Sequence, residues 1–218
     1  MTLWDLFVIA AGAYLLGSLN GSLLVSRAFL KVDIRDYGSG NAGTTNALRV
    51  MGKKWAALVT VIDLSKGALA VMMGYYLLRD AGEANLGKLL AGVFVIIGHI
   101  FPVFFRFKGG KGVMTTAVVV AFVDWRVFVI VLTVFIIVVL ITRWVSLGSL
   151  FAAIGMPLGM FFLHRGEGGE MIVLTVLSGV ISLIIFIMHR DNLKRILEGN
   201  ERKLSFRRRA VLEEDEDK

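Results

Sequence analysis

The chain has no cysteine, only two prolines and only three histidines among its 218 residues. Without cysteine, disulfides, thiolate nucleophiles and zinc–thiolate centres are excluded. The three histidines are widely separated, so we expect no dedicated transition-metal site, and we expect no cofactor. The scarcity of proline leaves long segments in which no residue interrupts a helix.

Apolar residues dominate what is present. They make up 56% of the chain, and the mean hydropathy is +0.75, values outside the range of ordinary water-soluble domains. A membrane β-barrel would alternate apolar and polar residues, whereas the segment 127–142 is apolar on every side. Because backbone in lipid must satisfy its own hydrogen bonds, such segments form helices. The sequence therefore predicts an all-α, polytopic integral membrane protein.

Seven segments come close to the roughly 20 residues that cross the hydrocarbon core of a bilayer. They are residues 3–25, 55–78, 87–105, 113–123, 127–142, 147–163 and 171–188. The fourth is the shortest, and it is either a partial span packed against protein or a span that begins inside the preceding loop. No basic residues precede the first span, so we interpret it as a retained helix and not a cleaved signal peptide. Its Gly17 and Gly21, four residues apart, predict a close packing face.

Basic residues divide unevenly between the two sides of this arrangement. Of the 24 Lys and Arg residues, nineteen fall on the side of the C-terminus, four fall on the other side, and Lys66 lies inside the second span. The positive-inside rule then places the N-terminus outside and the C-terminus in the cytoplasm. Because the basic residues lie at the ends of apolar spans, membrane orientation explains them better than nucleic-acid binding, which we do not expect. We interpret residues 1–206 as one transmembrane domain and the mixed-charge run 207–218 as a disordered tail.

A polar, glycine-rich segment, residues 38–49, separates the first two spans. Glycines let backbone N–H groups converge on one anion, and arginine offers a planar fork for two phosphate oxygens. The candidate binding residues here are Arg35, Gly38, Ser39, Gly40, Asn41, Gly43, Thr45, Asn46 and Arg49. The glycine spacing is similar to that of a Walker loop, but threonines follow where lysine is needed, so we reject a nucleotide hydrolase. A flexible loop without a ligand is the alternative that the pattern leaves open.

A second glycine-rich segment, residues 107–112, is predicted on the same side of the membrane. The candidate residues in and near it are His99, Lys108, Gly109, Gly110, Lys111 and Thr115. Lysines beside backbone N–H groups suit a phosphate. A surface turn that binds lipid headgroups would have the same composition, and a lone histidine near a membrane end is equally compatible with a structural role.

Two charged residues, Asp63 and Lys66, lie well inside the second span. A charge at mid-bilayer costs roughly 2.5–3.5 kcal/mol on insertion scales, so both side chains must face the bundle. Their spacing of three lets them pair on one helix face. The pair is either purely structural or a support for a site.

Two further groups recur at helical spacing on the predicted cytoplasmic side. They are Arg143, Ser146 and Ser149, where the fifth span meets the sixth, and His189, Asn192 and Arg195, after the last span. Each group can occupy one face of a helix. An arginine that anchors a helix end and a basic juxtamembrane helix are the respective alternatives.

The segments GSGNAGTTNALR, GHIFPVFFRFKGGKG and HRDNLKRILEGNE together resemble the three cytoplasmic motifs of the bacterial acyl-phosphate:glycerol-3-phosphate acyltransferase family. The intramembrane Asp63-x-x-Lys66-Gly67 and the run RWVSLGSL also fit this family, and the resemblance covers nearly the whole chain. Three departures, Ala42 for a frequent Pro, Thr44 for a common Ala and Leu193 for a frequent Ile, remove no polar residue.

The resemblance implies transfer of a fatty acyl group from acyl phosphate to the first hydroxyl of glycerol 3-phosphate. The substrates would be these two phosphate compounds, the setting would be the lipid bilayer of the bacterial inner (plasma) membrane, and the product would be lysophosphatidate. Chain-length preference and oligomeric state stay open.

The resemblance also implies roles for the candidate residues. The catalytic set would be Ser39, Asn41, Asn46, Arg49, His99, Lys108 and Lys111, the other candidates would bind substrate, and Asp63 and Lys66 would support them. The His-x4-Asp pair of better-known acyltransferases is absent, which favours direct attack by the glycerol hydroxyl. Its proton would pass to the donor phosphate, to His99 or to His189. We expect Arg49→Ala and Lys108→Ala to abolish activity.

Two other functions are compatible with parts of the pattern. A transporter of organic phosphates would use intramembrane charges, but the chain lacks a second half that mirrors the first. A scaffold that binds anionic lipid would need the basic tail but not the glycine-rich segments. Acylation of labelled glycerol 3-phosphate distinguishes an enzyme from both.

Overall fold

All regular secondary structure is helical in residues 1–204, the part of the chain that the computed structural model describes. The helices are α1 (Leu3–Ser18), α2 (Gly21–Phe29), α3 (Thr44–Leu78), α4 (Ala84–Ile100), α5 (Val113–Val123), α6 (Trp125–Thr142), α7 (Val145–His164), α8 (Gly169–Met188) and α9 (Arg190–Leu197), with short 3-10 turns η1 (Ile34–Asp36), η2 (Arg79–Ala81) and η3 (Val103–Phe105). The all-α prediction is confirmed. The run 207–218, predicted to be disordered, lies outside the described residues.

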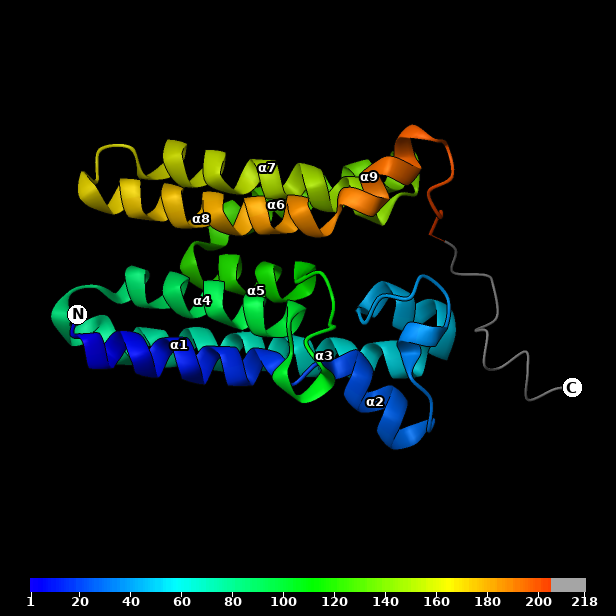
Figure 1. The fold of residues 1–218 in the computed structure, drawn as a ribbon. Helices are drawn as coiled ribbons and strands as arrows, with labels where there is room; N and C mark the ends of the chain where they lie inside the picture. The colour runs from blue at the N-terminus through cyan, green and yellow to red at the C-terminus, as the bar shows by residue number, and fades with distance from the viewer. Residues whose placement is uncertain (205–218) are drawn as a thin grey trace, which may run out of the picture.

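The long helices lie side by side in two groups (Figure 1). In one group α1, α3 and α4 pack against each other, and in the other α7 packs against α6 and α8. Contacts of α4 with α8, and of α5 with α4 and α6, join the groups. One buried apolar cluster runs through both, from Ile96 and Val119 to Met160 and Ile181.

Six helical segments within residues 1–204 are long and apolar enough to cross a membrane. They are Leu3–Phe29, Thr44–Ala81, Ala84–Phe105, Trp125–Thr142, Val145–His164 and Gly169–Met188. The apolar α5 has only 11 residues, about 16 Å of helix, against a hydrocarbon core of about 30 Å. The count of seven spans therefore stays a prediction.

The first of these segments is broken, although the sequence predicted one helix over residues 3–25. α1 ends at Ser18, and α2 begins after Asn20, whose side-chain oxygen accepts the N–H of Leu23. Asparagine is a strong N-cap, so it favours a new helix start over continuation. The close packing predicted for Gly17 is present, because a Cβ there would lie 2.2 Å from the carbonyl oxygen of Val95 in α4.

α3 changes direction at Gly52, whose φ of 81° is readily adopted only by glycine. The part before it, residues 44–51, crosses the end of the bundle, and the part after it runs along α1 and α4 (Figure 1). The glycine-rich segment 38–49, predicted as a loop, is therefore helical from Thr44 onward.

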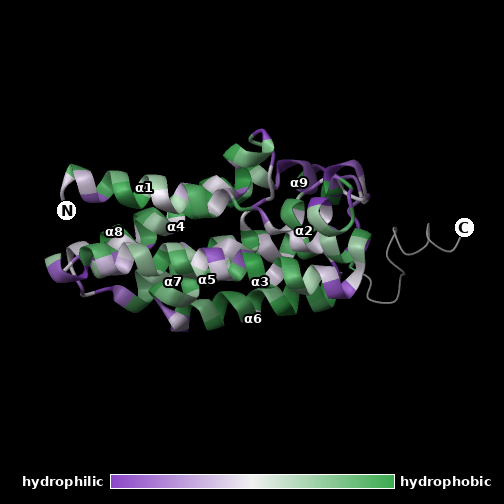
Figure 2. Cartoon of the chain, turned by 90° about the horizontal axis from the view of Figure 1, so that it is seen from below, coloured by the Kyte–Doolittle hydropathy of each residue, from purple (hydrophilic) through white to green (hydrophobic). Residues whose placement is uncertain are grey.

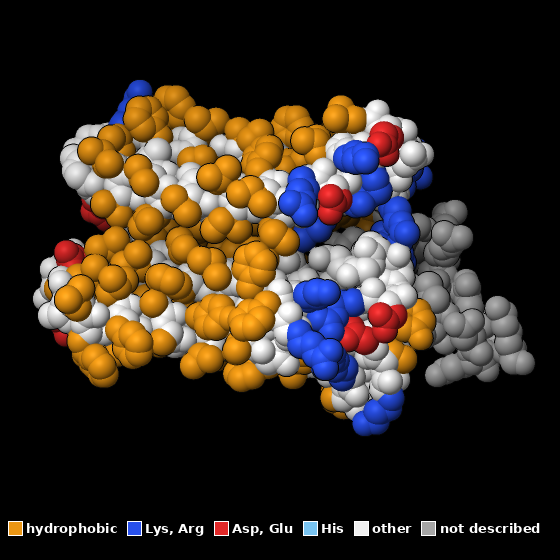
Figure 3. Space-filling model, viewed as in Figure 1, with side chains coloured by type: hydrophobic (Ala, Val, Ile, Leu, Met, Phe, Trp, Pro, Cys, Tyr) orange, Lys and Arg blue, Asp and Glu red, His pale blue; other side chains and the backbone are white. Residues whose placement is uncertain are grey.

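Basic side chains gather at one end of the bundle. Hydrophobic residues occupy the middle of the helices and hydrophilic residues the ends (Figure 2). Lys and Arg side chains cluster near α2 and α9, at the end opposite the N-terminus (Figures 1 and 3). The N-terminus and α9 at opposite ends fit an odd number of crossings, while the orientation with this end in the cytoplasm stays a prediction.

Candidate active site

A cavity of about 550 Å³ lies between the two helix groups at the end that carries α9. Its walls come from the segment before α3, the starts of α3, α5 and α7, the end of α8, and α9 with the residues that follow it. The predicted site residues that line it are Ser39, Gly40, Asn41, Gly43, Thr45, Asn46, Arg49, Asp63, His99, Lys111, Ser146, Ser149, His189, Asn192 and Arg195. Segments far apart in the sequence therefore meet around one space.

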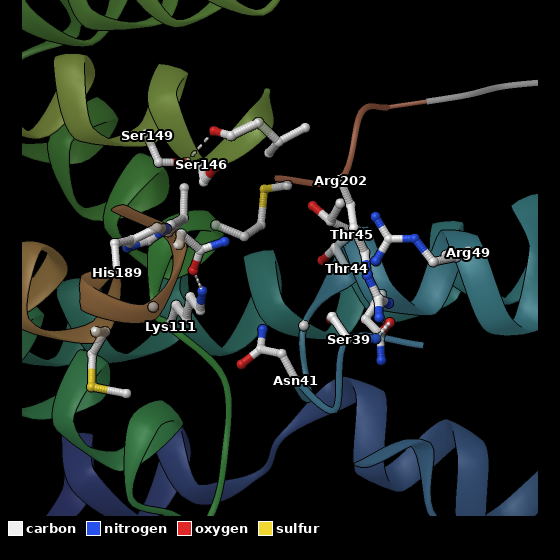
Figure 4. Close-up of a pocket in the computed structure, with 18 of the residues that line it drawn as sticks. Ser39, Asn41, Thr44, Thr45, Arg49, Lys111, Ser146, Ser149, His189 and Arg202 are labelled. Atoms are coloured by element: carbon white, nitrogen blue, oxygen red, sulfur yellow. Dashed lines mark hydrogen bonds between the residues drawn. The ribbon is translucent and has the colours of Figure 1, made fainter. Parts of the chain in front are cut away.

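The N-terminus of α3 lies at the wall of this cavity. The helix begins at Thr44, and its N-cap, Gly43, has no side chain to accept the first N–H groups. Such N–H groups carry partial positive charge and form a ready anion site. In Figure 4, Arg49 and Arg202 lie together beside this helix start. Neither guanidinium makes a hydrogen bond within residues 1–204, so both are available to an anion.

Asn46, one of the predicted binding residues, holds the glycine-rich segment in shape. It is buried, and its side-chain oxygen accepts the backbone N–H of Ser39 at 2.9 Å. Its amide nitrogen donates to the carbonyl of Tyr37 at 3.1 Å. The Asn46 amide is thus committed to the loop in this structure, whereas Asn41 directs its amide into the cavity (Figure 4).

Arg35 joins the first glycine-rich segment to the second. Its guanidinium forms two hydrogen bonds, at 2.9 and 2.7 Å, with the carboxylate of Asp33, and it donates to the carbonyls of Phe105 and Lys108 at 3.1 and 2.9 Å. The guanidinium of Arg35 holds the pKa of Asp33 well below its usual range. Arg35 therefore positions the two segments and does not reach the cavity.

The backbone N–H groups of Gly109 and Gly110, expected beside the phosphate-binding lysines, are already paired. Gly109 donates to the carbonyl of Ile100 at 2.9 Å, and Gly110 donates to the carbonyl of His99 at 3.1 Å. In this arrangement neither N–H is available to an oxyanion. The bonds instead pin the segment against the end of α4.

Lys111 enters the cavity, and Lys108 does not. Lys111 donates from Nζ to the side-chain oxygen of Asn192 on α9, whereas the Lys108 side chain is exposed. Burial, together with the nearby charge of Arg195, lowers the pKa of Lys111 to about 8. Lys111 is therefore charged at neutral pH but loses its charge in mildly alkaline solution.

Glu201 organises the donors that surround α9. Its carboxylate accepts from the hydroxyl of Ser146 at 2.7 Å, from the amide of Asn192 at 2.7 Å and from Nε of Arg195 at 2.8 Å. Burial opposes the charge of Glu201, but these hydrogen bonds hold its pKa below the usual value. The chain returns toward α9 because Gly199 ends the helix with a φ of 71°. One carboxylate thus fixes three side chains of the cavity wall.

His189 offers a lone pair to the cavity. Its Nδ1 lies 2.8 Å from the carbonyl oxygen of Ile185, which can only accept, so Nδ1 carries the hydrogen and Nε2 is an acceptor. Burial and the charge of Lys111 lower the pKa of His189 to about 4. The ring is therefore neutral at physiological pH.

The predicted intramembrane pairing is present beside the cavity. Lys66 Nζ lies 2.8 Å from Asp63 Oδ1, and the two side chains are only 3% and 1% exposed. Asp63 also accepts the N–H of Gly21 at 3.2 Å, which ties α3 to the start of α2. Lys66 further contacts Nδ1 of His99 at 2.8 Å. Asp63 and His99 line the cavity, so the pair supports its wall.

Comparison with known proteins identifies the family. The sequence model of the glycerol-3-phosphate acyltransferase family matches residues 7–199. The chain therefore belongs to the glycerol-3-phosphate acyltransferase family. It is 39% identical over 192 residues to the glycerol-3-phosphate acyltransferase of Thermoanaerobacter pseudethanolicus, covering 88% of this chain and 92% of the relative. It is 40% identical over 215 residues to that of Salinibacter ruber, covering 93% and 94%.

Solved structures of this family share the fold. The crystal structure of PlsY, an integral membrane glycerol 3-phosphate acyltransferase, in its glycerol 3-phosphate form superposes with a TM-score of 0.80 at 33% identity, covering 92% of this chain and 96% of that one. The lysophosphatidic acid form superposes with a TM-score of 0.78 at 32% identity and the same coverage. The chain is accordingly an acyltransferase-family, multi-pass integral membrane protein.

Several residues predicted for an acyltransferase site lie outside the cavity wall. They are Arg35, Gly38, Lys66, Lys108, Gly109, Gly110, Thr115 and Arg143. Arg143 caps α6 with a φ of 61°, and its carbonyl accepts the N–H of Leu204. Helical spacing and composition cannot distinguish such positions from direct exposure to the cavity.

Some polar residues that line the cavity were missed from the sequence, among them Glu201 and Arg202. Glu201 and Arg202 come after the end of α9, which ends before Gly199. Helical spacing therefore gave no reason to place them at the cavity wall. The position of Glu201 at the end of the third family motif was the one available signal. Apolar members of the wall, including Phe135, Met114 and Met188, were also not singled out because such residues fill every span.

Proposed function

We propose that the protein transfers a fatty acyl group from acyl phosphate to the first hydroxyl of glycerol 3-phosphate, the initial step of phospholipid synthesis. The hydroxyl oxygen forms a bond to the carbonyl carbon, and the bond from that carbon to the phosphate oxygen breaks. The hydroxyl proton leaves with inorganic phosphate, and the product is 1-acyl-glycerol 3-phosphate. The observation that carries the proposal is one cavity, in a member of this family, that combines cations from separate segments with an apolar wall.

The charges of the cavity suit two phosphorylated molecules. Arg49 and Arg202 face the cavity beside the uncapped start of α3, which gives one seat for a dianion. Lys111 lies on the opposite wall with His189 (Figure 4), and Arg195 also lines the cavity. We assign the acyl phosphate to the first seat and glycerol 3-phosphate to the second. The apolar side chains of the wall would receive the start of the acyl chain.

The side chains of the cavity also favour an acyl donor that is already activated. Ser39 lines the cavity, but within residues 1–204 its hydroxyl has no histidine or carboxylate partner to activate it. Because no nucleophile stands ready for a covalent intermediate, the acyl group must arrive already activated. Acyl phosphate meets that requirement, and its leaving phosphate can take the proton.

The test is an assay of the purified protein with radiolabelled glycerol 3-phosphate and a choice of acyl donors. We expect palmitoyl phosphate to give a labelled, organic-extractable product, and palmitoyl coenzyme A to give none. Product from the thioester alone would overturn the choice of donor. Uptake of label into proteoliposomes without an acylated product would instead favour a transporter of organic phosphates.

We further propose that the cavity opens to the cytoplasm of a bacterial cell. The basic side chains near α2 and α9 support this orientation by the positive-inside rule. Cysteine accessibility provides the test, since the chain has no native cysteine. A cysteine introduced at Lys194 should resist an impermeant reagent in intact cells, and one at Arg165 should react.

A further inference from the structure

The ammonium group of Lys66 has three acceptors and three hydrogens to give them. Its Nζ lies 2.8 Å from Asp63 Oδ1, 3.1 Å from the carbonyl oxygen of Leu19 and 2.8 Å from Nδ1 of His99. A lysine ammonium can donate three hydrogen bonds and accept none. Each of these three contacts therefore uses one N–H of Lys66.

This geometry fixes the tautomer of the His99 ring. Because Lys66 donates to Nδ1, that nitrogen must present a lone pair, and the single hydrogen of the neutral ring lies on Nε2. The Asp63 carboxylate is 3.6 Å from Nδ1, too far to hold a hydrogen there instead. His99 thus has the opposite tautomer to His189, whose hydrogen lies on Nδ1.

His99 lies at the wall of the cavity. The side chain is 4% exposed, lines the cavity, and makes no hydrogen bond through Nε2 within residues 1–204. Gly110 packs against this ring, because a Cβ on Gly110 would lie 2.2 Å from Nε2. Any larger residue at this position would cover Nε2.

We infer that His99 donates its Nε2–H to the carbonyl oxygen of the acyl donor, and that Lys66 is the positioning residue that fixes this tautomer. The inference rests on the proposed function for the identity of that oxygen. As the glycerol hydroxyl adds to the carbonyl carbon, the carbonyl oxygen gains negative charge, and a fixed donor stabilises it. His99 does not take the hydroxyl proton, because one of its nitrogens is engaged by an ammonium and the other already carries hydrogen.

This role gives the buried ion pair a function beyond packing. A neutral partner in place of Lys66 could leave Nδ1 protonated and turn Nε2 into a lone pair that repels the carbonyl oxygen. Asp63 keeps the ammonium in place by accepting from it and from the N–H of Gly21. The ion pair of Asp63 and Lys66 thus determines which nitrogen of His99 carries the hydrogen.

The first test is ¹⁵N NMR of histidine-labelled protein in nanodiscs without substrate. The chain has three histidines, so each signal is assignable by single replacement. We expect hydrogen on Nε2 for His99 and on Nδ1 for His189, which serves as the internal control. Hydrogen on Nδ1 of His99, or on both nitrogens, would overturn the inference.

The second test removes Lys66. In Lys66→Met we expect the His99 signals to move toward a mixture of tautomers and kcat to fall. Should that variant not fold, the doubly neutral Asp63→Leu/Lys66→Met provides the same readout. An unchanged His99 tautomer in the folded variant would show that Lys66 is only structural, and would overturn its positioning role.

The third test compares two replacements of His99. His99→Ala should lower kcat by roughly 10²–10³-fold, the usual loss for one oxyanion donor, with a smaller change in KM. His99→Gln, whose amide can supply an N–H near the position of Nε2, should keep at least tenfold more activity than the alanine variant. Equal loss in both, with the acid limb of the pH profile removed, would indicate a general base and overturn the inference.

These tests separate the inference from the proposed function. The NMR measurement uses no acyl donor, so its outcome does not depend on whether acyl phosphate is the substrate. If palmitoyl phosphate yields no product while His99 carries hydrogen on Nε2, the choice of donor fails and the tautomer stands. If product forms and His99 has the other tautomer, the proposed function stands and the role of Lys66 fails.

Discussion

Two buried histidines lie at opposite ends of the bundle in opposite electrostatic settings. His99, beside the cavity, receives a hydrogen bond from the ammonium of Lys66 on one ring nitrogen. His164, at the other end of the bundle, has Nε2 2.8 Å from Asp124 and Nδ1 2.6 Å from Glu167. The first ring lines the cavity and has one nitrogen without a hydrogen bond within residues 1–204, whereas the second ring has both nitrogens engaged by carboxylates and does not line the cavity.

This difference indicates that His99 can contact a substrate, whereas His164 has a structural role. Asp124 also caps α6 and holds Arg126, so its carboxylate, through His164, joins the start of α6 to the end of α7. No ring atom of His164 is left for a ligand. At the cavity end the ion pair is more deeply buried, but it leaves one donor of His99 unused. The two ends should therefore respond differently to the same kind of substitution.

The largest effect on folding is expected for Asp63→Leu. The substitution leaves the Lys66 ammonium buried without a counter-charge, and breaking a buried pair in this way typically costs about 3–5 kcal/mol. At the other end, Glu167→Gln removes a carboxylate that is 46% exposed, and the loss should stay below about 1 kcal/mol. Unfolding in detergent measures both. The double variant Asp63→Leu/Lys66→Met should recover most of the stability, and failure to do so would show that packing and not charge dominates.

The sequence predicts the same role for Lys108 and Lys111, but only Lys111 enters the cavity. Among these two, we expect the larger effect on activity for Lys111→Ala. It should lower kcat/KM for glycerol 3-phosphate by roughly 10²–10³-fold, because the buried cation assigned to the phosphate of that substrate is lost. Lys108→Ala, the matched control in the same segment, should lose less than about tenfold because its side chain is exposed. From the sequence we expected Lys108→Ala to abolish activity; because the side chain is exposed, we now expect only this small loss. Equal losses in the two variants would contradict this assignment.

The sequence was sufficient for the class of fold and for the segments that line the cavity. Composition and apolar runs predicted helices in a membrane, and three motifs marked segments that do line one cavity. Lys111, Asn192 and His189 belong to those motifs and line the cavity. Even the pairing of Asp63 with Lys66 was readable, since a helical spacing of three and the energy of an unpaired charge in lipid allow little else.

The sequence could not predict the direction in which individual side chains point. Lys108 and Lys111 differ in exposure because hydrogen bonds of Gly109 and Gly110 to the end of α4 set the path of the chain between them. The return of Glu201 depends on a left-handed residue after α9 and on three donors brought from distant segments. Such features come from tertiary contacts, for which a local pattern holds no information.

Acid should affect the end that carries His164. Burial opposes the charge of Asp124, but hydrogen bonds from Arg126 and His164 lower its pKa from 3.8 to about 2. A lowered carboxyl pKa stabilises the fold above about pH 4, and this contribution, about 2 kcal/mol, is lost as the pH falls toward 2. Asp124→Asn keeps an N-cap but has no charge to lose, so the stability gap from wild type should close between pH 5 and pH 2. A constant gap would contradict the assignment.

Alkaline pH should lower activity through the cavity end of the molecule. Of the predicted effects, this one is the smallest at neutral pH. Lys111 is charged below its pKa of about 8, so kcat/KM for glycerol 3-phosphate should fall as the pH rises through that value. Lys111→Arg keeps a positive charge over the whole range, and even with a few-fold lower rate at pH 7 its alkaline limb should move upward by more than one pH unit. Lys108→Ala should leave the limb where it is. A limb that stays near pH 8 in Lys111→Arg would belong to another group, and the link between burial of Lys111 and phosphate binding would be lost.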